Sequence, residues 1–173
     1  MDERQIMIGM GQIAVSKDPG HVLTALGLGS CIAVCAYDPV ARAGGMIHVV
    51  LPSSAIGRPD GGPAKFADQG VPRLIGEMEQ QGSPRSRLRF AILGGANVLT
   101  CTNHAAALDV GRRNADAVVA ALQQHGFAII ADHVGGKVSR TVRLRVASGE
   151  VTVKTIRDGE TVLASLGNAH AQP

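Results

Sequence analysis

Residues 30–52 read SCIAVCAYDPVARAGGMIHVVLP, and this stretch decides the fold. It begins with an apolar run at 31–37 that carries β-branched residues, which predicts a strand. An Asp-Pro pair then suits the first two positions of a type I turn at 38–41. A second apolar run at 45–51 predicts the returning strand, which the proline after it ends. The stretch therefore predicts a β-hairpin.

The two strands of this hairpin carry a thiol and an imidazole. If the turn occupies residues 38–41, Cys31 lies directly opposite His48, with Cβ atoms roughly 4.5–5.5 Å apart. A bulge near Gly44 and Gly45 would instead move His48 to the other face. A cysteine beside a histidine is the minimum for a cysteine-nucleophile hydrolase. The alternative is that both are ordinary core residues, since free cysteine is often buried and inert.

The run that leads into Cys31, LGLGSC at 26–31, is rich in glycine. Small residues before the thiol leave room for a substrate to approach the backbone. The backbone N–H groups near Ser30 and Cys31, with Gly29 beside them, are therefore candidates for holding the oxyanion of an acyl-transfer intermediate. A neighbouring histidine is expected to lower the pKa of the thiol below its free value of about 8.5.

The composition is that of a single globular domain. The chain has 173 residues, of which 45% are hydrophobic and 18% charged, enough to build one good-sized core. No apolar run reaches the roughly 18–20 residues that span a bilayer, so no membrane insertion is expected. The opening MDER has no basic region followed by an apolar stretch, so no signal peptide is expected. Three cysteines, an odd count, favour a reducing, cytoplasmic compartment over a disulfide framework.

The charge is mildly basic, with a formal net charge of +3 and a pI near 9.0. The chain has no tryptophan, one tyrosine and three phenylalanines, so it lacks the aromatic platforms on which bases stack. It also lacks the motifs of nucleic-acid readers, and we expect no nucleic-acid partner.

Periodicity along the rest of the chain predicts an α+β domain at 1–166 with a largely antiparallel or mixed sheet system, and a flexible tail at 167–173. One helix is predicted at 65–81, kinked or begun at Pro72, and a second at 115–125. The further predicted strands are 5–15, 21–28, 88–93, 127–132, 140–147 and 150–156.

Taken together, the motifs resemble those of the CheD family, the chemoreceptor glutamine deamidases. The resemblance covers nearly the whole chain, and several ordered motifs are more specific than any one of them. The motifs are LGLGSC at 26–31, YDP at 37–39, GGMIH at 44–48, LP at 51–52, KFAD at 65–68, GGA at 94–96, GRRN at 111–114, Asp132 with GG at 135–136, and SR at 139–140.

The resemblance implies a fold like that of deamidating bacterial toxins, with sheet layers flanked by helices. It implies that Cys31 is the nucleophile and His48 its base, with no metal and no cofactor. The implied reaction turns glutamine side chains on the cytoplasmic helices of chemotaxis receptors into glutamate. Methyl ester hydrolysis is a plausible second reaction, because the same attack is easier on an ester, whose methoxide leaves more easily than the unprotonated nitrogen of an amide.

Two positions depart from the family pattern. The family has a threonine six residues before the cysteine, where this chain has Ala25, and Thr24 is one residue away. Either a bulge at Gly27 restores Thr24 to the site or another group orients His48, because adjacent strand residues face opposite ways. The family also often has an aromatic residue, where a CheC-type phosphatase docks, at a place where this chain has Leu99.

Two other kinds of function compete with the deamidase. A zinc site could use Cys31, Cys35 and His48, or Cys101 and His104, but residues 31 and 35 of one strand lie about 13 Å apart and cannot share one zinc. The second competitor is a non-catalytic adaptor that binds receptors or a CheC-type phosphatase. In such a protein Cys31 and His48 would be vestigial. Arg112, Arg113 and Asn114 either orient the helix that follows them or touch the substrate.

Overall fold

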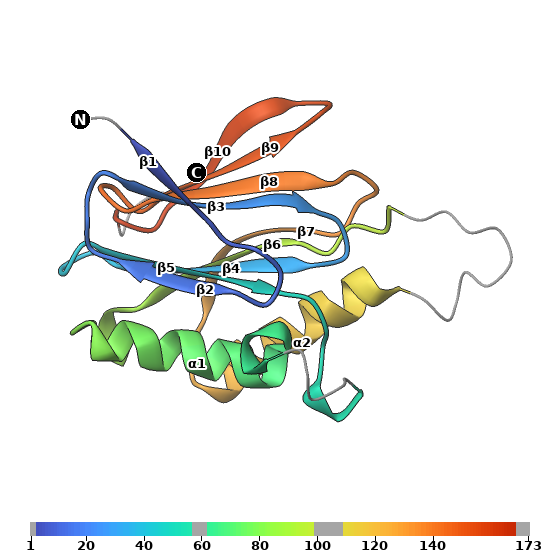
Figure 1. Cartoon of the computed structure of the whole chain (residues 1–173), viewed down its shortest axis with the longest axis horizontal. Coiled ribbons are helices and arrows are strands. Elements are labelled where there is room, and N and C mark those ends of the chain that lie inside the picture. Colours follow the sequence, from blue (N-terminus) through green and yellow to red (C-terminus); the bar gives the residue numbers. More distant parts are fainter. Residues whose placement is uncertain (1–2, 57–61, 99–108, 169–173) are drawn as a thin grey trace, which may run out of the picture.

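The computed structural model describes residues 3–56, 62–98 and 109–168. This part of the chain forms two five-stranded sheets and two α-helices (Figure 1). Sheet A has the strand order β1-β3-β8-β9-β10, and sheet B has the order β2-β5-β4-β6-β7. The elements are β1 (Arg4–Met7), β2 (Ile13–Ser16), β3 (His21–Leu28), β4 (Ile32–Asp38), β5 (Ala43–Val49), α1 (Ala67–Gln80), β6 (Arg89–Gly94), α2 (Val110–Gln124), β7 (Ile129–Val134), β8 (Arg140–Arg145), β9 (Glu150–Thr155) and β10 (Gly159–Ser165).

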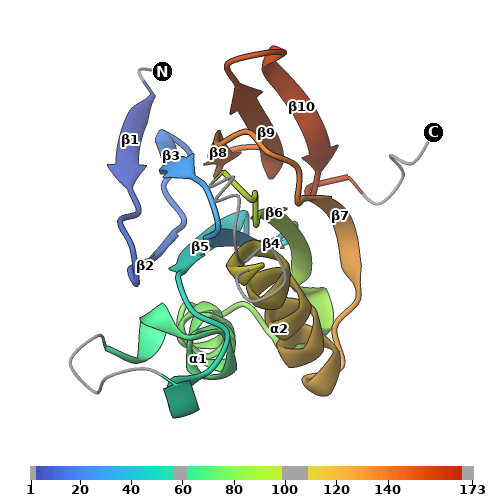
Figure 2. The same cartoon turned by 90° about the vertical axis from the view of Figure 1, so that its right-hand side faces the viewer.

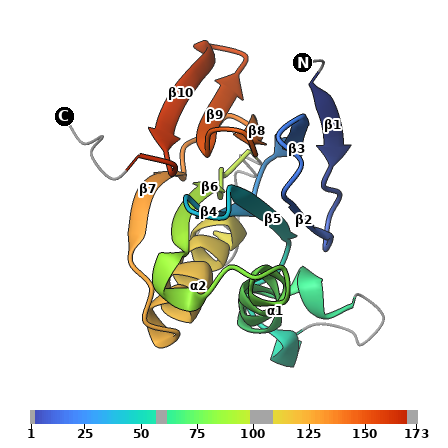
Figure 3. The ribbon, with the colours of Figure 1, turned by 90° about the vertical axis from the view of Figure 1, so that its left-hand side faces the viewer.

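The elements stack in three layers. Seen from either end, sheet A lies on one face of sheet B, and α1 and α2 cover the other face (Figures 2 and 3). Both sheets are mixed, because β1 runs parallel to β3 and β6 runs parallel to β7, whereas the other pairs are antiparallel. The prediction of an α+β fold with layered sheets and flanking helices is confirmed.

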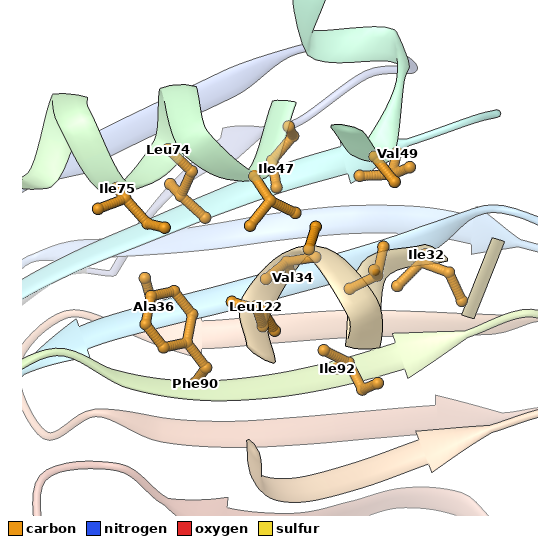
Figure 4. Close-up of a cluster of buried hydrophobic side chains, with 14 of the residues drawn as sticks. Ile32, Val34, Ala36, Ile47, Val49, Leu74, Ile75, Phe90, Ile92 and Leu122 are labelled. Carbon is orange, nitrogen blue, oxygen red and sulfur yellow. The ribbon is translucent and has the colours of Figure 1, made fainter. Parts of the chain in front are cut away.

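Sheet B is the middle layer, which explains the continuous apolar runs of the hairpin. Every residue of β4 and β5 is buried, as expected for strands covered on both faces. Ile32, Val34 and Ala36 pack against the helices (Figure 4). Ala33 and Cys35, which alternate with them, pack in the core between the two sheets. The hairpin thus joins two cores.

Both helices were predicted, with different boundaries. Helix α1 turns Val71, Leu74 and Ile75 towards sheet B and holds Pro72 in its interior, so the helix does not begin there. Helix α2 begins at Val110, ahead of the predicted 115, because the Asp109 side chain accepts a hydrogen bond from the Arg112 amide and caps the helix. A side-chain oxygen in that position satisfies one of the free amides at a helix start.

Two strand predictions were wrong. Residues 5–15 form two strands, β1 in sheet A and β2 in sheet B, and the connection at 8–12 crosses between the sheets with Gly11 at a φ of 72°. Strand β10 was missed, because most of its residues are exposed and carry no alternating pattern. Its pairing with β9 completes the edge of sheet A.

The C-terminal part of the fold reaches at least to Leu166, which is fully buried and donates its amide to the Gly149 carbonyl. The predicted tail at 167–173 falls mostly outside the described residues. Among the helices of the described residues, none is long and apolar enough to cross a membrane.

Candidate active site

The β4–β5 hairpin differs from its predicted register by two residues. His48 pairs with Ala33, and Ile32 pairs with Val49. The turn is longer than predicted, since Asp38 pairs with Ala43 and the loop between them contains Arg42 with a φ of 50°. Because side chains alternate with a period of two, a shift of two residues keeps each side chain on its face.

Cys31 and His48 therefore still share one face of sheet B. Cys31 directly precedes β4 and packs at the edge of the core between the sheets. His48 is 5% exposed and pairs with Ala33 of that same core. By ordinary sheet geometry the two are diagonal neighbours, with backbones roughly 7–8 Å apart, within reach of a long side chain. The structure places the pair between the two sheets.

A backbone carbonyl fixes the tautomer of His48. Its Nδ1 lies 3.1 Å from the Ile8 carbonyl oxygen. A carbonyl can only accept, so Nδ1 carries the proton and Nε2 keeps its lone pair. Nε2 is buried and has no hydrogen-bond partner among the described residues. The imidazole is thus held with a free basic nitrogen inside the layer.

The connection between β1 and β2 holds this carbonyl in place. The Ile8 amide donates to the Thr24 carbonyl at 2.8 Å. The backbone of His48 is braced from the same connection, since Gly11 donates to its carbonyl and its amide donates to Gln12. The Gln12 side chain in turn accepts from the Gly9 amide. The imidazole ring and its backbone are therefore fixed by one segment.

Burial keeps both members of the pair neutral. It lowers the pKa of His48 below its ordinary value of 6.5, and the Ile8 carbonyl opposes this only in part. Burial also raises the pKa of the Cys31 thiol, opposite to the lowering that a Cys–His ion pair would produce. Desolvation disfavours the charged form of either group. The geometry is that of a thiol and a neutral base, not of a preformed thiolate–imidazolium pair.

The loop at 29–31 is anchored by its carbonyl groups. The Gly29 carbonyl accepts from the Ala96 amide at 2.7 Å, and the Cys31 carbonyl accepts from the Gly95 amide at 2.8 Å. The Ser30 carbonyl accepts from another donor, the Nδ2 of Asn114, at 2.8 Å. The amides of Ser30 and Cys31 donate to no other group in the described part of the chain. These N–H groups remain available to an oxyanion.

The GGA sequence at 94–96 is shaped for this contact. Gly94 has a φ of 127°, and a Cβ there would overlap the Cys31 carbonyl oxygen. Gly95, with a φ of 68°, lies against Gly111 at the start of α2. Only glycine combines this backbone conformation with so close an approach. The loop at 29–31 thus rests on the GGA segment at the end of β6, and Asn114 of α2 holds its Ser30 carbonyl.

The structure does not bring the Thr24 hydroxyl to the pair. Thr24 is buried, and its Oγ1 makes a long 3.5 Å contact with the Val22 carbonyl. Its neighbours Leu23 and Ala25 point into the core between the sheets, so Thr24 faces the other way. A bulge does occur between Ala25 and Leu28, but it follows Thr24 and leaves its direction unchanged. The link between Thr24 and His48 is indirect. The Thr24 carbonyl accepts from the Ile8 amide, and the Ile8 carbonyl accepts from His48 Nδ1.

The other cysteines do not extend the site. Cys35 is completely buried in the core between the sheets, and burial raises the pKa of its thiol to about 12. No cluster of three or more potential metal ligands occurs within residues 3–56, 62–98 and 109–168. Cys101, His104 and Leu99 lie outside these residues.

Known proteins match the chain over most of its length. The family model described as CheD chemotactic sensory transduction matches residues 50–155. A protein of Symbiobacterium thermophilum named "Probable chemoreceptor glutamine deamidase CheD" is 41% identical over 92% of this chain and 97% of its own length. The chain belongs to the CheD family.

Other CheD proteins are similar to this chain over a comparable length. The "Chemoreceptor glutamine deamidase CheD" of Thermotoga maritima is 40% identical over 89% of this chain and 94% of its own length. A relative from Desulfitobacterium hafniense is 38% identical over 91% and 98%. Among solved structures, the hypothetical protein YfiH of Bacillus licheniformis covers 69% of this chain and 56% of its own, at 15% identity and a TM-score of 0.39, a likeness too weak to bear on function.

Motif reasoning singled out Cys31 and His48 as candidates but did not reveal two groups that hold His48 and the loop at 29–31. The Ile8 carbonyl belongs to the backbone, so no side-chain motif reveals it. Asn114 was noticed within GRRN at 111–114, and only the fold shows that it reaches the loop at 29–31. The Asp109 cap was a usable sign that this asparagine lies in the helix.

Proposed function

We propose that this chain is a chemoreceptor glutamine deamidase in which Cys31 is the nucleophile and His48 the general base. CheD family membership and the names of the relatives support the reaction. The single observation that carries the residue roles is the state of His48. Its Nδ1 is fixed on the Ile8 carbonyl while Nε2 stays free, on the face that it shares with Cys31.

The first half of the reaction forms a thioester. His48 Nε2 takes the Cys31 proton as the sulfur attacks the Cδ of the substrate glutamine. The amide oxygen becomes an oxyanion, which the N–H groups of Ser30 and Cys31 hold, each worth roughly 2.7–4 kcal/mol in comparable sites. The imidazolium then protonates the leaving nitrogen, and ammonia departs. Because both groups start neutral, the proton moves during the attack.

The second half regenerates the thiol. His48 removes a proton from water, and the hydroxide attacks the thioester carbon. The tetrahedral intermediate collapses to the glutamate carboxyl group, and the thiolate leaves and takes back the proton from His48. Helix α2 supports both halves through Asn114, which holds the Ser30 carbonyl next to Cys31.

The third member of the site is assigned to the Ile8 carbonyl, in place of a threonine hydroxyl. A hydrogen-bond acceptor on Nδ1 is enough to set the tautomer and the ring orientation of a catalytic histidine. A cytoplasmic location, binding of receptor helices, docking of a CheC-type phosphatase and hydrolysis of glutamate methyl esters all remain predictions.

Ammonia release from a purified receptor cytoplasmic fragment tests the proposal. Cys31→Ala is expected to abolish release, because no other group described at the site can form the thioester. Cys35→Ala is the matched control, since Cys35 is a buried, protonated thiol of the same core, and this variant is expected to keep its activity. Undiminished turnover by Cys31→Ala would sink the assignment.

The adaptor alternative is separated by the same variants. An adaptor would bind the receptor fragment equally well as the wild type and as Cys31→Ala, and it would release no ammonia in either form. A deamidase releases ammonia only with the thiol present, and its Cys31 is alkylated faster when His48 is intact.

A further inference from the structure

We infer that Asn114 is a positioning residue, which aims the Cys31 N–H at the oxyanion and ties the loop at 29–31 to the end of the strand that carries His48. The inference rests on the proposed function and assigns a role to a side chain of α2, more than eighty residues along the chain from the nucleophile.

Asn114 bridges the two halves of the site. Its Nδ2 donates to the Ser30 carbonyl at 2.8 Å and to the Val50 carbonyl at 2.9 Å. Ser30 directly precedes the nucleophile, and Val50 lies two residues after His48. Both neighbours are carbonyl oxygens, so the amide nitrogen must be the atom that faces them. One side chain therefore fixes the distance between the loop and the strand end.

The bond to Ser30 also sets the direction of a proposed oxyanion donor. The Ser30 carbonyl and the Cys31 N–H belong to one peptide unit, which is planar and trans, so they point in opposite directions. A donor that holds the carbonyl on the α2 side turns the N–H away from α2. Hydrogen bonds along a chain also polarise one another, which makes this N–H a stronger donor.

The neighbouring peptide is held in the same way. The Gly29 carbonyl accepts from the Ala96 amide, and its peptide partner is the Ser30 N–H. One carbonyl is thus held by the backbone of the GGA loop and the other by Asn114. The two N–H groups proposed for the oxyanion are aimed by separate anchors, and only that of Cys31 depends on a side chain.

Asn114 is completely buried, and one of its polar atoms, Oδ1, has no partner among the described residues. A buried polar atom without a hydrogen bond costs stability; a leucine of similar shape would avoid that cost but would take the donor away from the Ser30 and Val50 carbonyls. The asparagine supplies an Nδ2 amide group that donates two hydrogen bonds, one to each carbonyl.

Three variants test the inference with the whole chain. Asn114→Leu removes both hydrogen bonds at similar volume, and Asn114→Asp keeps the shape but turns a carboxylate towards two carbonyls. Gln123→Glu is the matched control, because it makes the same amide-to-acid change on an exposed residue of the same helix. Thermal unfolding shows which variants fold.

The expected result separates positioning from general damage. In Asn114→Leu, kcat for ammonia release falls about 10²-fold, as expected for misplaced transition-state groups, while KM and the rate of Cys31 alkylation by iodoacetamide stay close to the wild type. Asn114→Asp loses at least as much, and Gln123→Glu keeps its kcat. An unchanged kcat in Asn114→Leu overturns the inference, as does a parallel loss of kcat, alkylation and melting temperature.

One readout does not depend on turnover. The amide resonance of Cys31 in a ¹⁵N-labelled sample reports the orientation of the Ser30–Cys31 peptide, and it is expected to shift in Asn114→Leu but not in Gln123→Glu. An unmoved resonance overturns the inference even if the enzyme is active. An inactive wild-type enzyme with the expected shift would overturn the proposed function, and with it the catalytic purpose of Asn114, while showing that Asn114 still orients the Ser30–Cys31 peptide.

Discussion

At the scale of single residues, the chemistry of the site depends on which nitrogen of His48 holds a proton. The Ile8 carbonyl accepts a hydrogen bond from Nδ1, so the proton is on Nδ1. Burial lowers the pKa of the imidazole, so the ring stays neutral. The thiol is neutral as well. A base that is ready before the substrate arrives suits a reaction in which the thiol is deprotonated during attack.

The pH dependence of kcat/KM follows from these two groups. Protonation of His48 removes the base, and its pKa lies below 6.5, so activity is expected to fall only as the pH drops below that value. The pKa of the Cys31 thiol lies above 9.0, so the alkaline decline is expected above that value. Initial rates with a receptor fragment across this range measure both limbs.

The matched variant is His48→Asn, which keeps a polar side chain but cannot act as the base. Its rate is expected to fall by about 10²–10⁴-fold, as for removal of a general base, and its acid limb should disappear. An acid limb centred well above pH 6.5, or one that survives in His48→Asn, would contradict the role assigned to His48.

Cys31 and His48 could be singled out from the sequence, but the contacts that hold them in place could not. Cys31 and His48 stand out because a thiol and an imidazole occur on facing apolar strands. The acceptor for His48 is the backbone carbonyl of Ile8, and every residue type has such a carbonyl, so the sequence does not show which one is used. Asn114 is far away in sequence, so its contact with Ser30 appears only once α2 is packed on sheet B.

At the scale of elements, the hairpin was predicted and its register was not. The Asp-Pro pair does begin the turn, as the Asp38 side chain accepts from the Val40 and Ala41 amides. The turn then runs two residues further than predicted, to Ala43, and it includes Arg42 in a left-handed conformation that is uncommon for a residue with a side chain. No propensity rule anticipates that choice. The site survived the error because the shift was an even number of residues.

Helix α1 offers a matched pair of glycines that tests how tightly it packs on β5, the strand that carries His48. A Cβ at Gly70 would overlap the side chain of Ile47 in β5, whereas a Cβ at Gly76 meets nothing within 4 Å. Gly70→Ala is therefore expected to destabilise the fold by about 1–3 kcal/mol through overpacking. Gly76→Ala is expected to stabilise it by about 0.5–1 kcal/mol through helix propensity.

Urea unfolding of the two variants measures both effects in one experiment. The wild-type chain is the common reference, and the slope of the transition should be unchanged because the same surface is exposed. Equal effects of the same sign at both positions would show that α1 does not contact Ile47 as closely as described.

At the scale of the whole molecule, the fold places a buried histidine between two sheets, and this links stability to pH. In the unfolded chain His48 titrates near its ordinary 6.5, and in the folded protein at a lower pH. Between these values the unfolded state binds a proton that the folded state does not. The free energy of unfolding therefore falls as the pH drops below 6.5, by up to about 1.4 kcal/mol per pH unit for this single group.

The carboxylate of Asp38 affects the free energy of unfolding in a different, more acidic pH range. Hydrogen bonds from Arg87 and from nearby amides hold the pKa of Asp38 below 3.8 against the opposing effect of burial, so its contribution is lost only in more acidic solution. Urea unfolding at about pH 7.5 and about pH 5 thus isolates the histidines. His48→Asn is expected to show a smaller fall than the wild type, and an identical fall in both would show that His48 is not buried as a neutral group.

Mass spectrometry of a receptor cytoplasmic fragment tests the central claim most directly. The fragment is incubated with the wild type, Cys31→Ala or Cys35→Ala, and each modified glutamine is located by peptide mapping. The account predicts a gain of about 1 Da at specific glutamines with the wild type and Cys35→Ala, as an amide becomes an acid through a cysteine nucleophile, and no gain with Cys31→Ala. The same gain with Cys31→Ala would contradict it.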